Sequence, residues 1–177
     1  MIRFFILMIL KKSNMSIQKA LLIELTREKD NTHKIIERLK DEDFNYKPHP
    51  KSMSLGELAN HIVELHNWVK YALTKDTFDF YTDYTPSNFT SINDLLNVLN
   101  QGFEENKKLV EALDEEKYLY VWTLKAGNKI IAELPRAGAL RFIITNHLIH
   151  HRGQLTVYMR LLNIPIPGIY GPSGDEK

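Results

Sequence analysis

The stretch that decides the fold of this chain is Pro135–Leu162, PRAGALRFIITNHLIHHRGQLTVYMRLL. Apolar side chains recur in it at steps of three and four, the spacing of one helix face. The resulting stripe is Leu140, Ile144, His147, His151, Leu155, Tyr158 and Leu162. The pattern predicts one continuous helix, about 40 Å long. Pro135 suits its first turn, and Pro165 forbids its continuation.

Two histidines of this stripe, His147 and His151, lie one turn apart on the predicted inward face. Burying two imidazoles in an apolar seam is unfavourable unless each ring nitrogen finds a partner. A shared metal ion satisfies both rings at once. The alternative is a pair of core histidines that bond side chains or backbone, and the spacing leaves both interpretations open.

Three further segments, residues 16–40, 54–75 and 91–113, have helical periodicity. Ser54 and Glu57 form the sequence signature of a capping box. The next connection, residues 76–90, is rich in aromatic side chains. We expect these rings either to cover one end of the molecule or to form the wall of a small-molecule pocket. The rings proposed for that wall are Phe78, Phe80, Tyr81 and Tyr84.

Residues 118–124 and 129–134 flank the turn Ala126-Gly127-Asn128 and alternate enough to predict a short β-hairpin. The predicted fold class is therefore all-α: a four-helix bundle with long connections and a short hairpin between the third and fourth helices. We expect residues 15–177 to form a single domain. Residues 1–14 are interpreted as an extension, disordered or not native, with Met15 as the natural start.

Composition excludes several classes of protein. The formal net charge is +1, from 23 basic and 22 acidic residues, so the chain lacks the basic footprint of a nucleic-acid-binding protein. No cysteine is present, which excludes a cysteine nucleophile and a thiolate metal site. The apolar run of residues 4–10 is far too short to span a bilayer, and no cleavage site follows it. We therefore expect a cytoplasmic protein that binds neither nucleic acid nor membrane.

A third metal ligand is expected from a facing helix, and His61 is the best candidate. It belongs to a second apolar stripe, made of Leu58, His61, Leu65, Trp68 and Ala72. Glu57 and Glu64 are near it by helical spacing, so either can accept a hydrogen bond from its free ring nitrogen. His66 lies about 140° around this helix and is expected to face away.

His150 competes with His151 as a ligand, because it lies three residues from His147. Helical phase favours His151 and leaves His150 as a rim or substrate-contacting residue. Arg152 is expected to turn away, as a surface or subunit-contact charge. Gln154 returns to the metal face, where it can orient a ligand or contact a substrate.

The segments Leu58-Ala59-Asn60-His61-Ile62 and Asn146-His147-Leu148-Ile149-His150-His151-Arg152-Gly153-Gln154-Leu155 together resemble the DinB-like (damage-inducible) family. The likeness extends over about residues 16–175. It includes Glu133-Leu134-Pro135-Arg136 and the tail from Pro167 to Ser173. The resemblance implies a homodimeric bundle with one divalent metal, zinc or nickel, held by His61, His147 and His151. Related families contain thiol-dependent S-transferases and isomerases.

Three neutral imidazoles leave one coordination position open, as in catalytic zinc sites. We expect a metal-dependent enzyme that transfers a low-molecular-weight thiol or hydrolyses a small substrate. His150, Gln154 and Tyr170 are the candidate substrate contacts. The alternative is a non-catalytic metal-binding stress protein or dimeric interaction module. A DNA-binding role is suggested by the family label alone, and the near-neutral charge opposes it.

Overall fold

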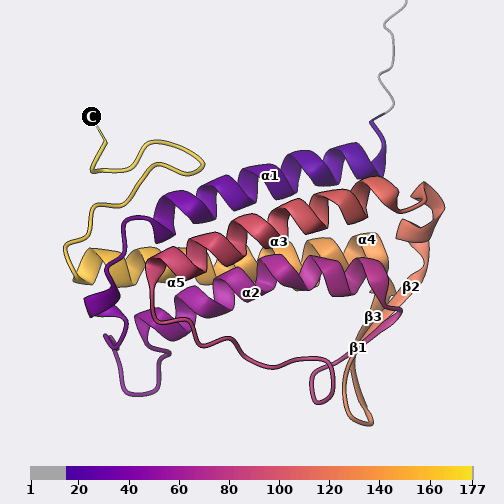
Figure 1. The fold of residues 1–177 in the computed structure, drawn as a ribbon, viewed down its shortest axis with the longest axis horizontal. Helices are drawn as coiled ribbons and strands as arrows, with labels where there is room; N and C mark the ends of the chain where they lie inside the picture. Colours follow the sequence, from indigo (N-terminus) through magenta and orange to yellow (C-terminus); the bar gives the residue numbers. More distant parts are fainter. Residues whose placement is uncertain (1–14, 177) are drawn as a thin grey trace, which may run out of the picture.

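The computed structural model describes residues 15–176. Four long helical segments lie side by side, and a small sheet packs at one end of them (Figure 1). The chain is therefore mostly helical, as predicted. The predicted extension, residues 1–14, lies outside the described residues. No helix between residues 15 and 176 combines the length and apolarity needed to cross a membrane.

The first three long helices are α1 (Ile17–Ile36), α2 (Leu55–Thr74) and α3 (Ile92–Ala112). A serine caps each of them. The Ser54 side chain accepts from the Glu57 amide at 3.1 Å, and Glu57 accepts from the Ser54 amide at 2.6 Å, which confirms the capping box. Short 3-10 helices occupy residues 41–43 and 115–119.

The first helix ends four residues earlier than predicted, at Ile36. The amides of Arg38 and Leu39 bond carbonyls three residues back, at 3.2 and 3.0 Å, so the chain tightens into a turn. This turn brings Leu39 into the core, where it is 5% exposed. Because Leu39 is a core residue, the apolar periodicity in the sequence continues past the end of the helix.

The fourth long segment is not one uniform α-helix. It consists of α4 (Arg136–Gly138), a π-helical segment (Ala139–Thr145) and α5 (Asn146–Leu161). The Asn146 amide bonds the carbonyl of Arg141, five residues back. Each π-helical residue turns the chain through a smaller angle than an α-helical residue does. The side chains after Thr145 therefore point in other directions than a uniform α-helix predicts. Leu148 and Arg152 are buried, whereas His147 and His151 lie half-buried at the edge of the seam.

The sheet has three strands where the sequence predicted a hairpin of two. They are β1 (Thr77–Asp79), β2 (Val121–Ala126) and β3 (Lys129–Pro135), in the order β1-β2-β3. The β2–β3 pair is the predicted antiparallel hairpin, and Gly127 takes a positive φ of 59° in its two-residue loop. The unpredicted strand β1 pairs parallel with β2. It lies in the segment that the sequence suggested to be a loop.

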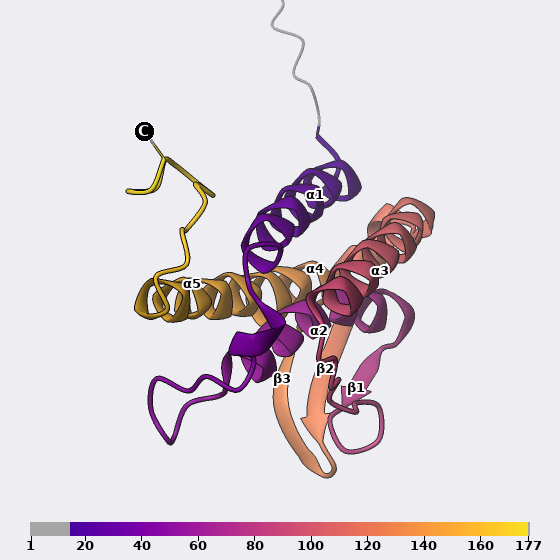
Figure 2. The ribbon, with the colours of Figure 1, turned by 60° about the vertical axis from the view of Figure 1, so that its left-hand side comes forward.

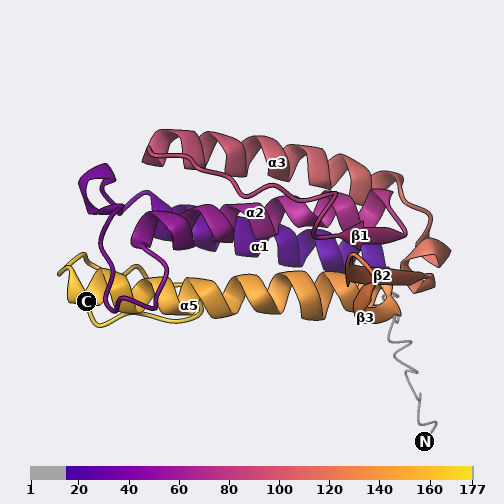
Figure 3. The ribbon, with the colours of Figure 1, turned by 90° about the horizontal axis from the view of Figure 1, so that it is seen from below.

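Helix α2 lies between α3 and α5 (Figure 3). Fourteen of its twenty residues are buried, which is typical of a helix surrounded by other elements. In the view turned by 60°, α1 lies above α2, with α3 on one side and α5 on the other (Figure 2). The aromatic connection after α2 returns along its length to the start of α3 (Figure 1). The residues of α2 that face α5 and this connection are those that form the site.

Candidate metal centre

Three histidines from two helices converge beside the seam between α2 and α5. His61 comes from α2, and His147 and His151 come from α5. The centroid of the His61 ring lies 5.2 Å from that of His147 and 4.8 Å from that of His151. One nitrogen of each ring lies within 4.8 Å of those of the other two. The structure therefore brings together the trio that the sequence proposed.

The remaining nitrogens of two of these rings are held by neighbouring side chains. His61 Nδ1 donates to Glu64 Oε2 at 3.3 Å, because a carboxylate can only accept. His151 Nδ1 donates to Gln154 Oε1 at 2.7 Å. These bonds leave Nε2 of both rings unprotonated, the form in which imidazole binds a metal. His147 Nε2 lies 2.8 Å from His151 Nε2.

The local electrostatics keep His147 and His151 uncharged. Burial, and then the neighbouring histidines, lower the pKa of His147 to about 4. Burial also lowers the pKa of His151, against the opposing hydrogen bond to Gln154. Metal ligation requires neutral imidazole. At neutral pH, His147 and His151 can therefore bind a divalent cation without first losing the extra proton of an imidazolium.

Glu64 is the most highly connected residue next to the trio. Its Oε2 also accepts from the Tyr84 hydroxyl at 2.6 Å, and its Oε1 accepts from the Ser87 amide. Burial alone raises the pKa of Glu64, but the bonds from His61, Tyr84 and Ser87 lower it below its usual value overall. Glu64 is therefore a buried carboxylate, and it bonds the free nitrogen of His61 as predicted for this residue or Glu57. Glu57 instead accepts a hydrogen bond from the Ser54 amide in the capping box of α2.

The aromatic residues of the connection divide between the core and the site. Phe78, Phe80 and Tyr84 each place a ring centroid 5.3 Å from that of Trp68. Phe78 is fully buried, so it forms core and no pocket wall. Tyr81 is 78% exposed and packs near the hairpin turn at Gly127. Of the four rings proposed as a wall, Tyr84 lines a groove at the site.

Two grooves reach the histidines. One, of about 540 Å³, includes His61, Glu64, Tyr84 and Ser87 in its lining. The other, of about 480 Å³, includes His151 and Gln154. The residues common to both are Lys51, Ser52 and Met53. Small molecules can therefore approach the trio from either side of this short segment.

The proposed substrate contacts differ in their placement. His150 is exposed, and its ring centroid is 5.1 Å from that of His151, at the rim. Gln154 lines a groove and holds His151. Tyr170 is placed elsewhere, because its hydroxyl donates to Glu28 Oε2 at 2.7 Å and accepts from Arg152 at 2.5 Å. Its polar group is occupied in a different network.

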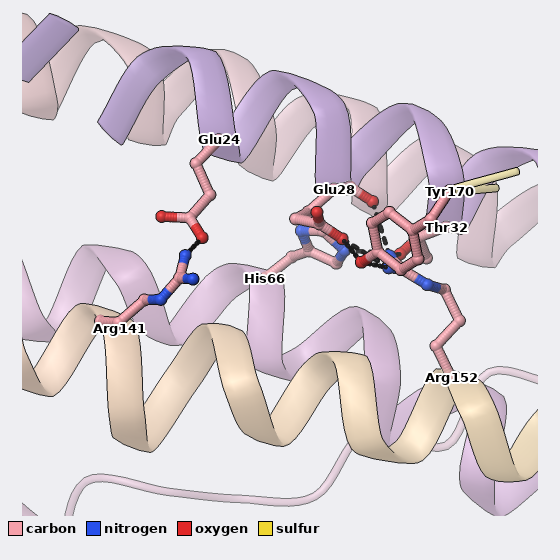
Figure 4. A network of polar contacts seen from close by, with 7 residues as sticks. All are labelled: Glu24, Glu28, Thr32, His66, Arg141, Arg152 and Tyr170. Atoms are coloured by element: carbon pink, nitrogen blue, oxygen red, sulfur yellow. Dashed lines mark hydrogen bonds and ion pairs between the residues drawn. The ribbon is translucent and has the colours of Figure 1, made fainter. Parts of the chain in front are cut away.

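That network corrects the expectation that Arg152 is a surface charge. Arg152 is 2% exposed, and it pairs with Glu28 of α1 at 2.5 Å (Figure 4). It also donates to Thr32 Oγ1 at 3.1 Å, and the same hydroxyl lies 2.9 Å from His66 Nε2. His66 does face away from the metal site, as expected, but into this buried network. The π-helical segment makes a second link to α1, through the ion pair of Arg141 with Glu24.

Sequence reasoning missed Asn60 and Ser87 in the surroundings of His61, and it proposed Tyr84 as a pocket wall without its hydrogen bond to Glu64. The Asn60 side chain bonds both the amide and the carbonyl of Phe89, each at 2.9 Å. A buried position next to His61 on the helix was the available signal for Asn60. The backbone amide of Ser87 gives no sequence signal, because any residue carries one.

Comparison with known proteins agrees with this architecture. The DinB family profile matches residues 12–176. The chain is 32% identical over 155 residues to YrdA of Bacillus subtilis, covering 84% of this chain and 85% of that protein. Among solved structures, a DinB-like protein of Bacillus cereus is 26% identical with a TM-score of 0.64, covering 86% of this chain and 97% of the other. The DinB-like protein YjoA of Bacillus subtilis shares the fold, with a TM-score of 0.66 at 20% identity, covering 86% of this chain and 98% of the other. The chain belongs to the DinB family.

Proposed function

We propose that this protein binds one divalent metal ion, zinc or nickel, through His61, His147 and His151, and that it is a metal-dependent enzyme. The observation that carries the proposal is the convergence of the three rings from two helices. The hydrogen bonds of Glu64 and Gln154 to the second nitrogens of His61 and His151 add support. A structural role for these histidines in the core would not require the three nitrogens to face one another.

Catalysis is favoured over a purely structural metal by two features of the site. Three histidines leave one coordination position for water or substrate, whereas structural zinc sites have four protein ligands. The two grooves give small molecules access to the trio. A bound divalent ion supplies a Lewis acid that activates water or a thiol near neutral pH.

The proposed reaction is transfer of a low-molecular-weight thiol to an electrophile, or hydrolysis of a small substrate. Glu64 and Gln154 orient the ligand rings, and Trp68 excludes water from behind them. We also propose that His150, whose ring centroid lies 5.1 Å from that of His151, contacts the substrate. We expect the protein to work as a homodimer in the cytoplasm, and light scattering after size-exclusion chromatography tests its oligomeric state.

Metal analysis of untagged protein tests the site. We expect about one metal ion per chain in the wild type and in His150→Ala, and less than about a tenth of that in His151→Ala. The His150 variant is a matched control, because it removes an adjacent imidazole from the same helix. Equal metal content in His151→Ala and wild type would reject His151 as a ligand.

Turnover tests the enzyme. Zinc- or nickel-loaded protein is assayed with pairs of small thiols and electrophiles, and with small esters and amides. We expect turnover that disappears in His147→Ala and on treatment with a chelator. A loaded protein that turns over none of these substrates, although the metal raises its melting temperature, would support the non-catalytic alternative.

A further inference from the structure

The segment of residues 84–89 is fastened to α2 on both sides of His61. Asn60, one residue before His61, bonds the amide and carbonyl of Phe89. Glu64, one turn after His61, accepts from the Tyr84 hydroxyl and the Ser87 amide. Both α2 side chains are buried, at 6% and 7% exposure. The 84–89 segment is thus held by these polar bonds as well as by the packing of Tyr84 and Phe89 against the core.

One of these two attachments is connected to the candidate metal ligand. Glu64 Oε2 accepts at once from the Tyr84 hydroxyl and from His61 Nδ1. The Tyr84 bond is short, at 2.6 Å, while the His61 bond is long, at 3.3 Å. Charge-assisted N–H···O bonds are ordinarily about 2.7–2.9 Å, so the His61 contact has room to shorten.

We propose that Tyr84 is a positioning residue for the metal site, and that metal binding at His61 in turn fixes the 84–89 segment through Glu64. The inference rests on the proposed metal binding by His61. A cation on Nε2 draws electron density from the ring, which makes the Nδ1 proton a stronger donor to the Glu64 carboxylate. Such coupling is reciprocal: if metal binding strengthens the attachment of the segment by some factor, the attachment strengthens metal binding by the same factor.

The coupling has a consequence for substrate binding. Tyr84, Pro86 and Ser87 belong to the lining of the groove of about 540 Å³ that reaches His61. The wall of that groove is therefore in its final position when the metal is bound. Substrate binding then depends on the metal in two ways: through coordination and through the shape of the groove.

Zinc affinity tests the first half of the proposal. Metal-free protein is titrated with Zn²⁺ in competition with a chromophoric chelator. Tyr84→Phe removes one hydroxyl and is expected to weaken zinc binding about 3- to 10-fold; Glu64→Gln is expected to weaken it about 10- to 100-fold. Tyr81→Phe is the matched control, because Tyr81 lies nearby in the chain but is 78% exposed; it should bind zinc like the wild type.

Amide hydrogen exchange, resolved by NMR, tests the second half. Zinc should slow exchange of the Ser87 amide about 3- to 10-fold in the wild type, and this slowing should vanish in Tyr84→Phe. The Phe89 amide, held by Asn60, should stay protected in both and so show that the segment is still folded. A purely structural Tyr84 would change Ser87 exchange equally with and without zinc, and that result would overturn the inference.

Failure of the inference is distinct from failure of the proposed function. A wild-type protein that binds no zinc would overturn both. Zinc binding that is equal in wild type, Tyr84→Phe and Tyr81→Phe would overturn the coupling and leave the three-histidine site in place.

Discussion

The histidines of this protein differ in what their second ring nitrogen contacts, and this difference separates their roles. In His61 and in His151, one ring N–H donates a hydrogen bond to a side-chain oxygen, and the other nitrogen faces the candidate metal position. His66 is buried and bonds Thr32. His150 is exposed. The residue type alone does not distinguish them, since burial and neighbours set the protonation of each ring.

His66 should make the protein less stable in mild acid. Burial, and then the charges of Arg152 and Lys29, lower its pKa from 6.5 to about 3. The unfolded chain therefore binds a proton below pH 6.5 that the folded chain does not take up until about pH 3. Stability from this residue is complete above pH 6.5 and is lost as the pH falls, by about 2 kcal/mol between pH 7 and pH 5.

The measurement is urea unfolding of wild type and His66→Gln at both pH values. A glutamine side chain does not titrate in this range, so the fall in unfolding free energy from pH 7 to pH 5 should be about 2 kcal/mol smaller in the variant. The trio is the same in both proteins, and its own titration cancels in the comparison. An identical pH dependence in the two would show that His66 is protonated in the folded state.

Helical spacing and phase predicted that His61, His147 and His151 converge, because residues three or four positions apart lie on one helix face, and the structure brings the three rings together. It was insufficient for Arg152. The π-helical segment shifts the helix phase just before this residue, and the carboxylate that pairs with it, Glu28, lies far away in the chain. Neither fact is visible in the local pattern.

At the scale of elements, α1 and α5 are joined by a buried ion pair. Arg152 of α5 bonds the carboxylate and the carbonyl oxygen of Glu28 on α1. Removing one partner of a buried pair leaves an uncompensated charge, which costs about 3–5 kcal/mol. The attachment between these helices is thus sensitive to single substitutions.

Arg152→Met should lower the free energy of unfolding by about 3–5 kcal/mol. The double variant Arg152→Met/Glu28→Gln should recover at least about 1 kcal/mol, because the orphaned carboxylate is gone. Arg160→Met is the control, since Arg160 pairs with Asp175 at 2.8 Å but is 54% exposed; its loss should cost less than about 1 kcal/mol. Equal losses in Arg152→Met and Arg160→Met, measured by urea unfolding, would contradict the buried-pair interpretation.

Elements with strong periodicity and caps were predictable, and short ones that depend on pairing were not. Helices α2 and α3 agree with the sequence to within two residues at each end. Strand β1 has three residues and exists by parallel pairing with β2, whose partner residues lie 46 positions further along the chain. Such a strand carries too little pattern of its own to be recognised.

At the scale of the whole molecule, the candidate ligands join α2 to α5. A metal that binds the folded protein, and not the unfolded chain, stabilises it by mass action. We expect zinc at 100 times its dissociation constant to raise the unfolding free energy by about 2.7 kcal/mol, and a chelator to reverse the gain. Thermal unfolding with and without zinc measures the effect.

His147→Ala serves as the control for this prediction. It should abolish the zinc-dependent gain while retaining the fold, as judged by circular dichroism. A gain of the same size in His147→Ala would place the stabilising metal elsewhere on the protein.

One aromatic residue of the tail, Tyr170, bonds the same buried ion pair. The Tyr170 hydroxyl donates to Glu28 and accepts from Arg152, which also bond each other (Figure 4). Tyr170→Phe should cost about 1.5–3 kcal/mol, the range for hydrogen bonds to charged groups. Tyr120→Phe is the control, because Tyr120 is exposed to a similar extent but its hydroxyl bonds no other residue between 15 and 176; it should cost less than about 0.5 kcal/mol in the same urea-unfolding experiment.

The sequence by itself determined the helical class, the hairpin and the three histidines, because helix periodicity, capping and ligand spacing are local properties of the chain. The tertiary structure decided which neighbours complete the site. Glu64 meets Tyr84 and Ser87 through packing of the connection on α2, and Arg152 meets Glu28 through packing of α5 on α1. Hydrogen bonds and ion pairs depend on distances in space, and residues 20 to 124 positions apart come within bonding distance only after the helices have packed.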